Sequence, residues 1–388
     1  MVEVGVILQL IGGVMSAFFL ILIITKKKVQ IWDKVLAINF VVLALALFLS
    51  YTDYYNLKNG YPYPHLLKLA VPLVLLHAPL FFIYIKTVAQ PKFRLRYVDV
   101  LHLTPFLFVF ILMLVGFYTL TPKEKVALDN SPDLVNHWSF QAIFAAMVLT
   151  SIIYYTWGYQ LVRQHSKNLS LFFSNTEVLE LKWLRFMLVF SLVTFPPVDL
   201  LYMLNPILGI ADYMLLQVIS YVAATINIVV FGYFGIKQCN IFKESNLQDE
   251  PLLHEEKVAE IAAEMPQEVD VSFEATLLRY MQECKPYLNP DLSIPILAQE
   301  MNVSVTYLSN VINGKLKLNF NDFINMYRIE EFKKSCSLPQ NRNYTLIGIA
   351  YDCGFNSKAT FYRVFKNAVG VTPSQYYESA NAKDAVSM

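Results

Sequence analysis

The sequence predicts an all-helical protein with two parts: a polytopic bundle of about seven transmembrane helices, and a C-terminal all-helical domain with two helix-turn-helix subdomains joined by a long helix. Three observations support this prediction. The 388 residues are 56% hydrophobic and 16% charged, with a mean hydropathy of +0.43, which is unusual for a soluble protein. Almost all long uncharged runs precede Lys237. After Glu274, one short helical pattern occurs twice.

Seven apolar windows are long enough to cross a bilayer. A spanning helix needs about 20 mostly apolar residues, because backbone groups in lipid must be hydrogen-bonded within the segment. We assign residues 1–237 to this transmembrane module. The second window is the shortest, and we extend its start to Asp33. The windows are Val4–Thr25, Val35–Tyr51, Leu66–Ala89, Asp99–Leu120, Trp138–Leu161, Lys182–Leu204 and Ala211–Ile236.

The basic residues of the short loops predict the orientation of these spans. Lys and Arg are retained on the cytoplasmic side. Loops on one side carry Lys26, Lys27, Lys28, Lys34, Lys92, Arg94, Arg96, Arg163 and Lys167. Loops on the other side carry Lys58, Lys123 and Lys125. We therefore expect a multi-pass protein of the bacterial inner membrane, embedded in its lipid bilayer, with the N-terminus outside and the C-terminal part in the cytoplasm.

Some polar residues lie inside the predicted spans. His77 and Asp199 are ionisable and lie close to prolines, which kink helices, so they are candidates for an intramembrane ligand pocket. The alternative is that they only form hydrogen bonds between helices. In the first span, Gly12, Gly13, Ser16 and Ala17 have the small-xxx-small spacing of helix dimers and are candidates for the face of a homodimer, although ordinary close packing produces the same spacing.

An acidic connector separates the two parts. We assign it to residues 238–275. Between Glu244 and Glu274 it contains many Asp and Glu residues and a single basic residue, Lys257. Such a segment is a solvated spacer, and a short helix before Pro266 is expected within it. The connector is also the expected cleavage zone if proteolysis releases the C-terminal domain.

An internal repeat is the strongest signal in the C-terminal domain, residues 276–388. Residues 297–313 and 349–366 align with a single inserted residue, which places one helix-turn-helix unit at about residues 292–313 and another at about 345–367. In each copy a serine, Ser304 or Ser357, is expected to cap the second helix. Gly354 suits the turn because it accepts a left-handed backbone, and Asn302 tolerates the same geometry.

The second helix of each unit is expected to present a polar face to the DNA major groove. With the apolar positions facing inward, Thr306, Ser309 and Asn310 point outward in the first unit. The corresponding residues of the second unit are Lys358, Ala359, Thr360 and Arg363. Between the units, Asn319–Asp322 reads as a capped helix start and Phe323–Cys336 as a long connecting helix, and Thr372 and Pro373 begin a final helix.

The C-terminal domain resembles the DNA-binding domain of AraC-type transcriptional regulators. The motifs are Ser304-x-x-x-Leu308-Ser309, Phe320-x-x-Phe323-Ile-x-x-Tyr327-Arg328, Ile349-Ala-x-x-x-Gly354-Phe355-x-Ser357, Phe361-x-Arg363-x-Phe365-Lys366 and Gly370-Val-Thr-Pro373-Ser-x-Tyr376. The whole chain is similar to membrane-linked members of that group, known mainly from Bacteroidetes, which carry a multi-helix N-terminal module.

The resemblance implies that two recognition helices enter adjacent major-groove segments of double-stranded DNA at a promoter or operator. Carried over by position, Thr306, Ser309 and Asn310 contact bases in the first unit, and Lys358, Ala359, Thr360 and Arg363 do so in the second. Lys315 and Lys366 are assigned to phosphate contacts. The first helix has Asn310 and Asn313 where many relatives have basic residues, so the second helix is expected to contribute more.

The sequence therefore predicts a membrane-bound transcription regulator whose transmembrane module senses a ligand or a membrane protein. We expect no enzyme activity, catalytic site, metal site or cofactor, because no phosphate-binding glycine loop or metal-ligand spacing is found. Two alternatives remain open. The bundle could be a transporter or lipid-modifying enzyme with a regulatory DNA-binding tail, or an anchor from which the regulator is released by proteolysis.

Overall fold

The computed structural model divides the chain into two compact units. It describes residues 2–90, 93–131, 134, 137–175, 181–209, 212–244, 271–341 and 343–386. The first unit comprises residues 1–163 and 182–252, and the second comprises residues 164–181 and 253–388. Regular structure in the described part of the chain is helical, apart from an isolated antiparallel bridge between Phe173 and Ser293. The all-helical fold class predicted from the sequence is confirmed.

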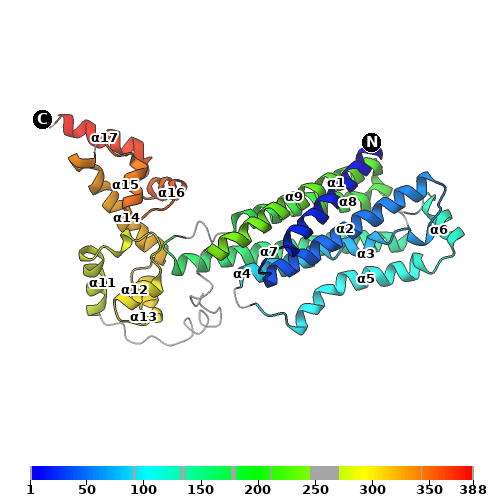
Figure 1. The fold of residues 1–388 in the computed structure, drawn as a ribbon, viewed down its shortest axis with the longest axis horizontal. Coiled ribbons are helices and arrows are strands. Elements are labelled where there is room, and N and C mark those ends of the chain that lie inside the picture. The colour runs from blue at the N-terminus through cyan, green and yellow to red at the C-terminus, as the bar shows by residue number, and fades with distance from the viewer. Residues whose placement is uncertain are drawn as a thin grey trace. The chain divides into compact units, whose positions relative to one another are not determined.

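The first unit is a bundle of long helices that lie alongside one another (Figure 1). Its elements are α1 (Val2–Ile24), α2 (Ile31–Lys58), η1 (Pro64–Leu66), α3 (Ala70–Val74), α4 (His77–Ala89), η2 (Tyr97–Leu103), α5 (Thr104–Met113), η3 (Leu114–Tyr118), α6 (Pro122–Asp129), α7 (Trp138–Phe172), α8 (Lys182–Leu208) and α9 (Tyr213–Glu244).

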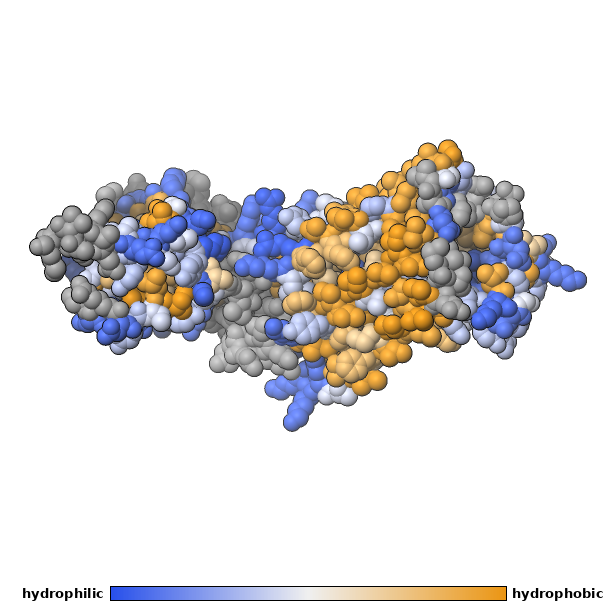
Figure 2. Space-filling view, turned by 90° about the horizontal axis from the view of Figure 1, so that it is seen from above, coloured by the Kyte–Doolittle hydropathy of each residue, from blue (hydrophilic) through white to orange (hydrophobic). Residues whose placement is uncertain are grey.

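Seven of these stretches are long and apolar enough to cross a membrane, as the sequence predicted. They are Val4–Ile24, Ile31–Lys58, Pro64–Ala89, Tyr97–Tyr118, Trp138–Phe172, Lys182–Leu208 and Leu215–Lys237. Large apolar side chains point outward from them: Val14, Phe48 and Val115 are each more than 60% exposed. Hydrophobic residues cover much of the bundle surface in Figure 2, with hydrophilic residues beyond this apolar region. A helix surface of this kind faces lipid rather than water.

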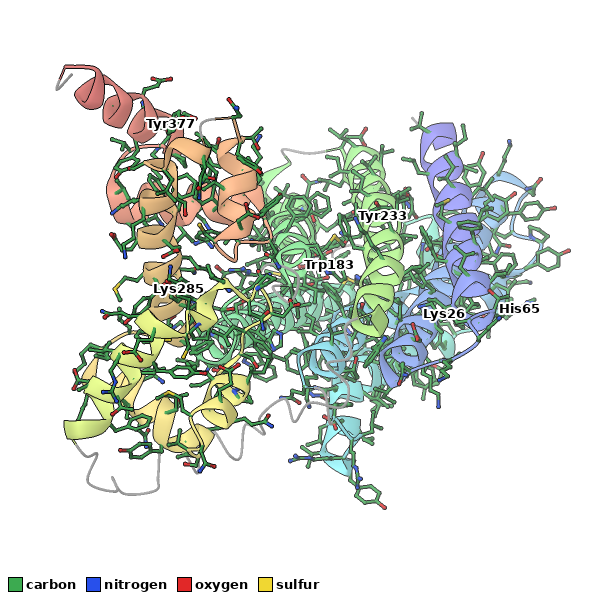
Figure 3. The ribbon with its side chains drawn as sticks, turned by 60° about the vertical axis from the view of Figure 1, so that its left-hand side comes forward. Lys26, His65, Trp183, Tyr233, Lys285 and Tyr377 are labelled. Carbon is green, nitrogen blue, oxygen red and sulfur yellow. The ribbon has the colours of Figure 1, made fainter. Side chains whose placement is uncertain are left out.

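The bundle is held together inside by aromatic rings. The Phe231 ring on α9 lies 4.8 Å from the ring of Phe81 and 5.0 Å from that of Tyr84, both on α4. Trp183 on α8 stacks on Phe234 at 5.7 Å, and its position among the bundle helices is visible in Figure 3. Because α4, α8 and α9 all contribute rings to this cluster, their packing is mutually dependent.

Two of the small residues of α1 lie at contacts inside the bundle. Gly12 and Ser16 are both buried, and a side chain on Gly12 would meet Leu47 of α2 and Thr225 of α9. Packing within one chain therefore accounts for Gly12 and Ser16, whereas nothing lies within 4 Å of a Cβ atom at Gly13, and Ala17 is exposed. A hydrogen bond of 3.3 Å from the Thr225 hydroxyl to the Leu8 carbonyl joins the same two helices, α9 and α1.

The second unit is a domain of shorter helices. They are α11 (Val271–Glu283), η4 (Pro286–Leu288), α12 (Ile294–Glu300), α13 (Val305–Asn310), η5 (Val311–Lys315), α14 (Phe320–Cys336), η6 (Pro339–Asn341), α15 (Leu346–Asp352), α16 (Lys358–Val369) and α17 (Pro373–Val386). Most of the acidic connector, including the helix expected before Pro266, lies outside the described residues. Residues 164–175, which the sequence assigned to the transmembrane module, belong to this second compact unit.

We predict that Gly232→Ala destabilises the bundle. A Cβ atom at Gly232 would lie 2.2 Å from the ring of Phe19, which is itself only 6% exposed and stacked on Phe40. Overpacking of this kind costs about 1–3 kcal/mol, so the thermal midpoint of the detergent-solubilised protein should fall. Gly13→Ala on α1 is the matched control, since nothing lies within 4 Å of a Cβ there. Equal midpoints for the two variants would contradict this packing.

Candidate nucleic-acid interface

The first helix-turn-helix unit consists of α12, a tight turn and α13. Asn302 in the turn has a φ of 54°, the left-handed conformation predicted from the sequence. The Ser304 hydroxyl caps α13 by accepting a hydrogen bond of 3.1 Å from the backbone N–H of Tyr307. Leu308, Val311 and Ile312 are completely buried and hold α13 and η5 against the core. The predicted turn and cap are confirmed.

The second unit repeats this arrangement with α15 and α16. Gly354 in its turn has a φ of 91°, and a Cβ atom there would lie 2.3 Å from the carbonyl oxygen of Tyr287. Glycine is required at this position both by the backbone conformation and by the close approach of a neighbouring chain segment. Ser357 caps α16 through the backbone N–H of Thr360, at 3.4 Å.

Helix α14 belongs to the cores of both units. Phe320, Phe323 and Ile324 in its first half are fully buried in the hydrophobic core around α12 and α13. Phe332 and Cys336 in its second half are buried in the core around α15 and α16. The helix begins with a cap from Asn319, whose side chain accepts from the Asp322 N–H. One rigid helix thus sets the spacing of the two units.

The outer side of α16 carries exposed basic side chains. Lys358, Ala359, Arg363 and Lys366 are exposed, and Thr360 is half-buried. Phe361 and Phe365 on the opposite side are fully buried, and their rings pack tilted and edge-on, respectively, against that of Phe332 on α14. The amphipathic pattern therefore fixes which face of α16 is available to a polyanion, and this face has net positive charge.

The exposed face of α13 is smaller than the sequence suggested, and it is less charged than that of α16, as expected. Thr306 and Asn310 are half-buried, and Lys315 at the end of η5 is exposed. Ser309 was expected to point outward, but it is only 5% exposed. Its hydroxyl accepts a hydrogen bond of 3.0 Å from the side-chain amide of Asn313, which lies one turn further along. The expected outward exposure of Ser309 was wrong, because α13 continues into the π-helical η5 and Asn313 pairs with it.

A buried arginine on α14 connects the two helix-turn-helix units. The sequence had not indicated this role. Arg328 is 1% exposed, and its guanidinium donates to the carbonyl of Tyr287 at 2.8 Å and to that of Asn289 at 2.7 Å. The same group lies 5.9 Å from the centre of the Phe355 ring, in the turn of the second unit. Burial lowers the pKa of Arg328 to about 10, so it remains charged near neutral pH. The sequence did contain a signal for this role, because Arg328 occupies one of the apolar positions of an amphipathic helix.

A second polar contact fixes the segment that precedes the first unit. Lys285 donates to the carboxylate of Glu331 on α14 at 2.6 Å, and the Tyr287 hydroxyl donates to the other oxygen at 3.2 Å. Figure 3 shows Lys285 beside α14. Together with Arg328, these contacts hold the chain around η4 against α14, where the Tyr287 carbonyl also approaches Gly354.

His77 and Asp199 are the candidate pocket residues of the transmembrane module, and each interacts with a different residue. His77 begins α4, and its Nδ1 lies 3.1 Å from the side-chain oxygen of Asn39 on α2. Asp199 on α8 is an electrostatic neighbour of Tyr155 on α7. Of these two interactions, the one between His77 and Asn39 is of the kind that the alternative of hydrogen bonding between helices describes. Lys68, by contrast, forms an ion pair of 2.8 Å with Asp129, and its backbone N–H donates to Asp53.

Comparison with known proteins identifies the family of the helix-turn-helix domain. The helix-turn-helix domain family matches residues 297–379. An uncharacterized HTH-type transcriptional regulator of Staphylococcus aureus (strain COL) is 33% identical over 90 residues, which are 23% of this chain and 12% of that protein. The C-terminal domain is an AraC-type helix-turn-helix domain. The probable transcription factor PqrA of Proteus vulgaris is similar to it too, at 26% identity over 96 residues, 25% of this chain and 76% of PqrA.

The family match lies within the AraC-type domain. The chain spans 12% of the length of the first curated relatives that it matches. No solved structure matches the chain. The matched residues 297–379 contain α13, α14, α15 and α16, so the likeness includes both recognition helices and the helix that joins them.

We predict that Gly354→Ala destabilises the AraC-type domain by at least about 2 kcal/mol, because an alanine there is strained at positive φ and collides with the Tyr287 carbonyl. Protease resistance of this domain in the full-length protein, followed over a urea series, measures the effect. Gly314→Ala is the control, since a Cβ atom there meets nothing within 4 Å. An unchanged urea midpoint for Gly354→Ala would count against the tight turn.

Proposed function

We propose that this chain is a membrane-bound, sequence-specific transcription regulator, without enzyme activity, in which the seven-helix module senses a signal and controls the AraC-type domain. One observation carries the proposal. A tandem helix-turn-helix domain with an exposed basic recognition helix, α16, belongs to the same chain as seven apolar helices of membrane-spanning length. Double-stranded DNA is the partner that such a domain fits, since the major groove admits an α-helix and the exposed face of α16 is basic.

The proposed contacts follow from exposure and charge. Arg363 and Lys358 are exposed on α16, where Arg reads guanine through two hydrogen bonds and Lys reads the same acceptors. Thr360 and Ala359 complete this face. On α13, the half-buried Thr306 and Asn310 are proposed to make fewer contacts, and Ser309 reaches a base only if Asn313 releases it. Lys315 and Lys366 are proposed to bind phosphate.

The packing of one loop supports a cytoplasmic position of the AraC-type domain. Residues 164–175 form the end of α7, the fifth span, and the start of the loop that leads to α8, the sixth span, and they belong to the same compact unit as the AraC-type domain. With seven spans, this loop and the chain after the last span lie on the same side of the membrane. Arg163 and Lys167 near the loop favour the cytoplasmic side. We therefore propose an inner-membrane protein with its N-terminus outside.

We predict that Arg363→Ala lowers specific DNA binding, because it removes a bidentate base contact worth about 1–3 kcal/mol of discrimination. Genome-wide crosslinking of the tagged full-length protein, with and without the change, measures promoter occupancy and yields the bound sites. Arg279→Ala is the matched control, because Arg279 is exposed on α11, outside both helix-turn-helix units. Immunoblots should show full-length protein at equal amounts in the membrane. Equal occupancy for Arg363→Ala and Arg279→Ala would refute the base-reading role.

For Lys366→Ala we predict weaker binding to every DNA sequence. A lysine bound to phosphate releases about one counterion, so its loss should make the dependence of log affinity on log salt shallower by about one. Fluorescence titrations of the nanodisc-embedded protein with labelled duplex over a salt series give this slope. Lys334→Ala, an exposed lysine on α14, should leave the slope unchanged. A slope that Lys366→Ala also leaves unchanged would rule out the phosphate contact.

A further inference from the structure

The end of α7 lies in the core of the AraC-type domain. Helix α7 begins in the bundle at Trp138, and from Gln164 onward it belongs to the second unit. Phe172, its last residue, is 7% exposed and belongs to the same buried cluster as Leu277 and Leu297, with Leu171 and Phe173 packed against that cluster. A single continuous helix therefore connects the membrane-spanning bundle to the core of the first helix-turn-helix unit. We call residues 171–174 the docking segment.

Backbone hydrogen bonds tie the docking segment to the start of α12. Phe173 and Ser293 form the antiparallel bridge. The backbone N–H of Ser174 donates to the Leu292 carbonyl at 3.2 Å, and the Ser174 hydroxyl donates to the same oxygen at 2.6 Å. Ser174 and Leu292 are each only 1% exposed, so water does not compete for these bonds.

Helix α14 holds the docking segment from the other side. The side-chain amide of Asn321 donates to the Ser174 carbonyl at 2.7 Å and to that of Phe173 at 3.4 Å. The Arg328 guanidinium donates to the Ser174 hydroxyl at 3.2 Å. Since Arg328 also binds the two carbonyls before α12 and lies over Phe355, the docking segment shares the network that joins the two units.

We propose that the docking segment is the contact through which the membrane module controls DNA binding, and that the docked arrangement is the DNA-binding one. Its hydrogen bonds go to Leu292, Asn321 and Arg328, none of which is among the proposed base-reading residues. Docking therefore leaves the faces of α13 and α16 free while it fixes the network that sets their spacing. A displacement of α7 that withdraws Ser174 removes a partner from Arg328 and loosens this spacing.

This inference rests on the proposed function, and an isosteric substitution tests it. Asn321→Asp keeps the shape of the side chain but replaces its donor with a carboxylate that faces two carbonyl oxygens. Asp is favourable in the first turn of a helix, so α14 should not be weakened. Gln282→Glu makes the same chemical change at an exposed position of α11 and serves as the control.

A disulfide reports docking independently of DNA. Bridged residues of antiparallel strands have Cα atoms about 4.5–5.5 Å apart, which suits a disulfide, so Phe173→Cys and Ser293→Cys should crosslink on mild oxidation. Cys239 and Cys284 are replaced by serine in this background. Cys336 and Cys353 are buried, which raises the pKa of their thiols to about 12 and about 11, so they remain unreactive thiols.

The full-length protein in nanodiscs is then titrated with a labelled duplex carrying the most enriched site from the crosslinking experiment. We expect Asn321→Asp to slow disulfide formation and to weaken DNA binding about five-fold or more, the effect of losing one or two hydrogen bonds. Gln282→Glu should change neither. Oxidation of the cysteine pair in the Asn321→Asp protein should restore affinity, which a general loss of folding could not produce.

The outcomes separate the inference from the function on which it rests. If the parent protein binds no DNA but the disulfide forms, the proposed function fails while docking stands. If the parent protein binds DNA and Asn321→Asp binds equally well despite slower crosslinking, the control role of the docking segment is overturned. Failure of the disulfide to form in the parent protein, or tighter binding by Asn321→Asp, overturns the docked arrangement as the DNA-binding state.

Discussion

The guanidinium group of Arg328 is the contact on which the geometry of the C-terminal domain depends. It satisfies the carbonyls of Tyr287 and Asn289, lies over the ring of Phe355 and binds the hydroxyl of Ser174. A charge buried to this extent is tolerated only when its donors are paired, and each lost partner leaves a buried polar group at a cost of about 1–3 kcal/mol. The same group therefore couples the two helix-turn-helix units and the end of α7.

This coupling gives the membrane module a physical route to the recognition helices. The two hydrophobic cores of the domain are separate, and α14 contributes fully buried phenylalanines to both. Their relative position is then adjusted by polar contacts beside α14, which are directional and can be made or lost as a set. A transmembrane helix that ends in one of these contacts can act on DNA binding without touching the DNA-reading surface.

Local features of the fold were predictable from the sequence because they depend on neighbouring residues. The apolar windows gave the seven spans, since backbone pairing in lipid requires a minimum length, although α7 continues to Phe172 beyond the predicted Leu161. The caps at Ser304 and Ser357 and the left-handed residues Asn302 and Gly354 were likewise readable, because capping and turn geometry are set within a few positions.

The sequence by itself determined the helical class, the number of spans and the tandem recognition helices, through periodicity, length and caps. Only the tertiary structure decided the burial of Ser309, the partners of Arg328 and the docking of residues 171–174. Ser174 lies 118 positions before Leu292 and 154 before Arg328, and no local pattern encodes a contact over that distance. Such contacts are chosen by which surfaces meet when the whole chain folds, and they place the end of α7 in the same compact unit as the AraC-type domain.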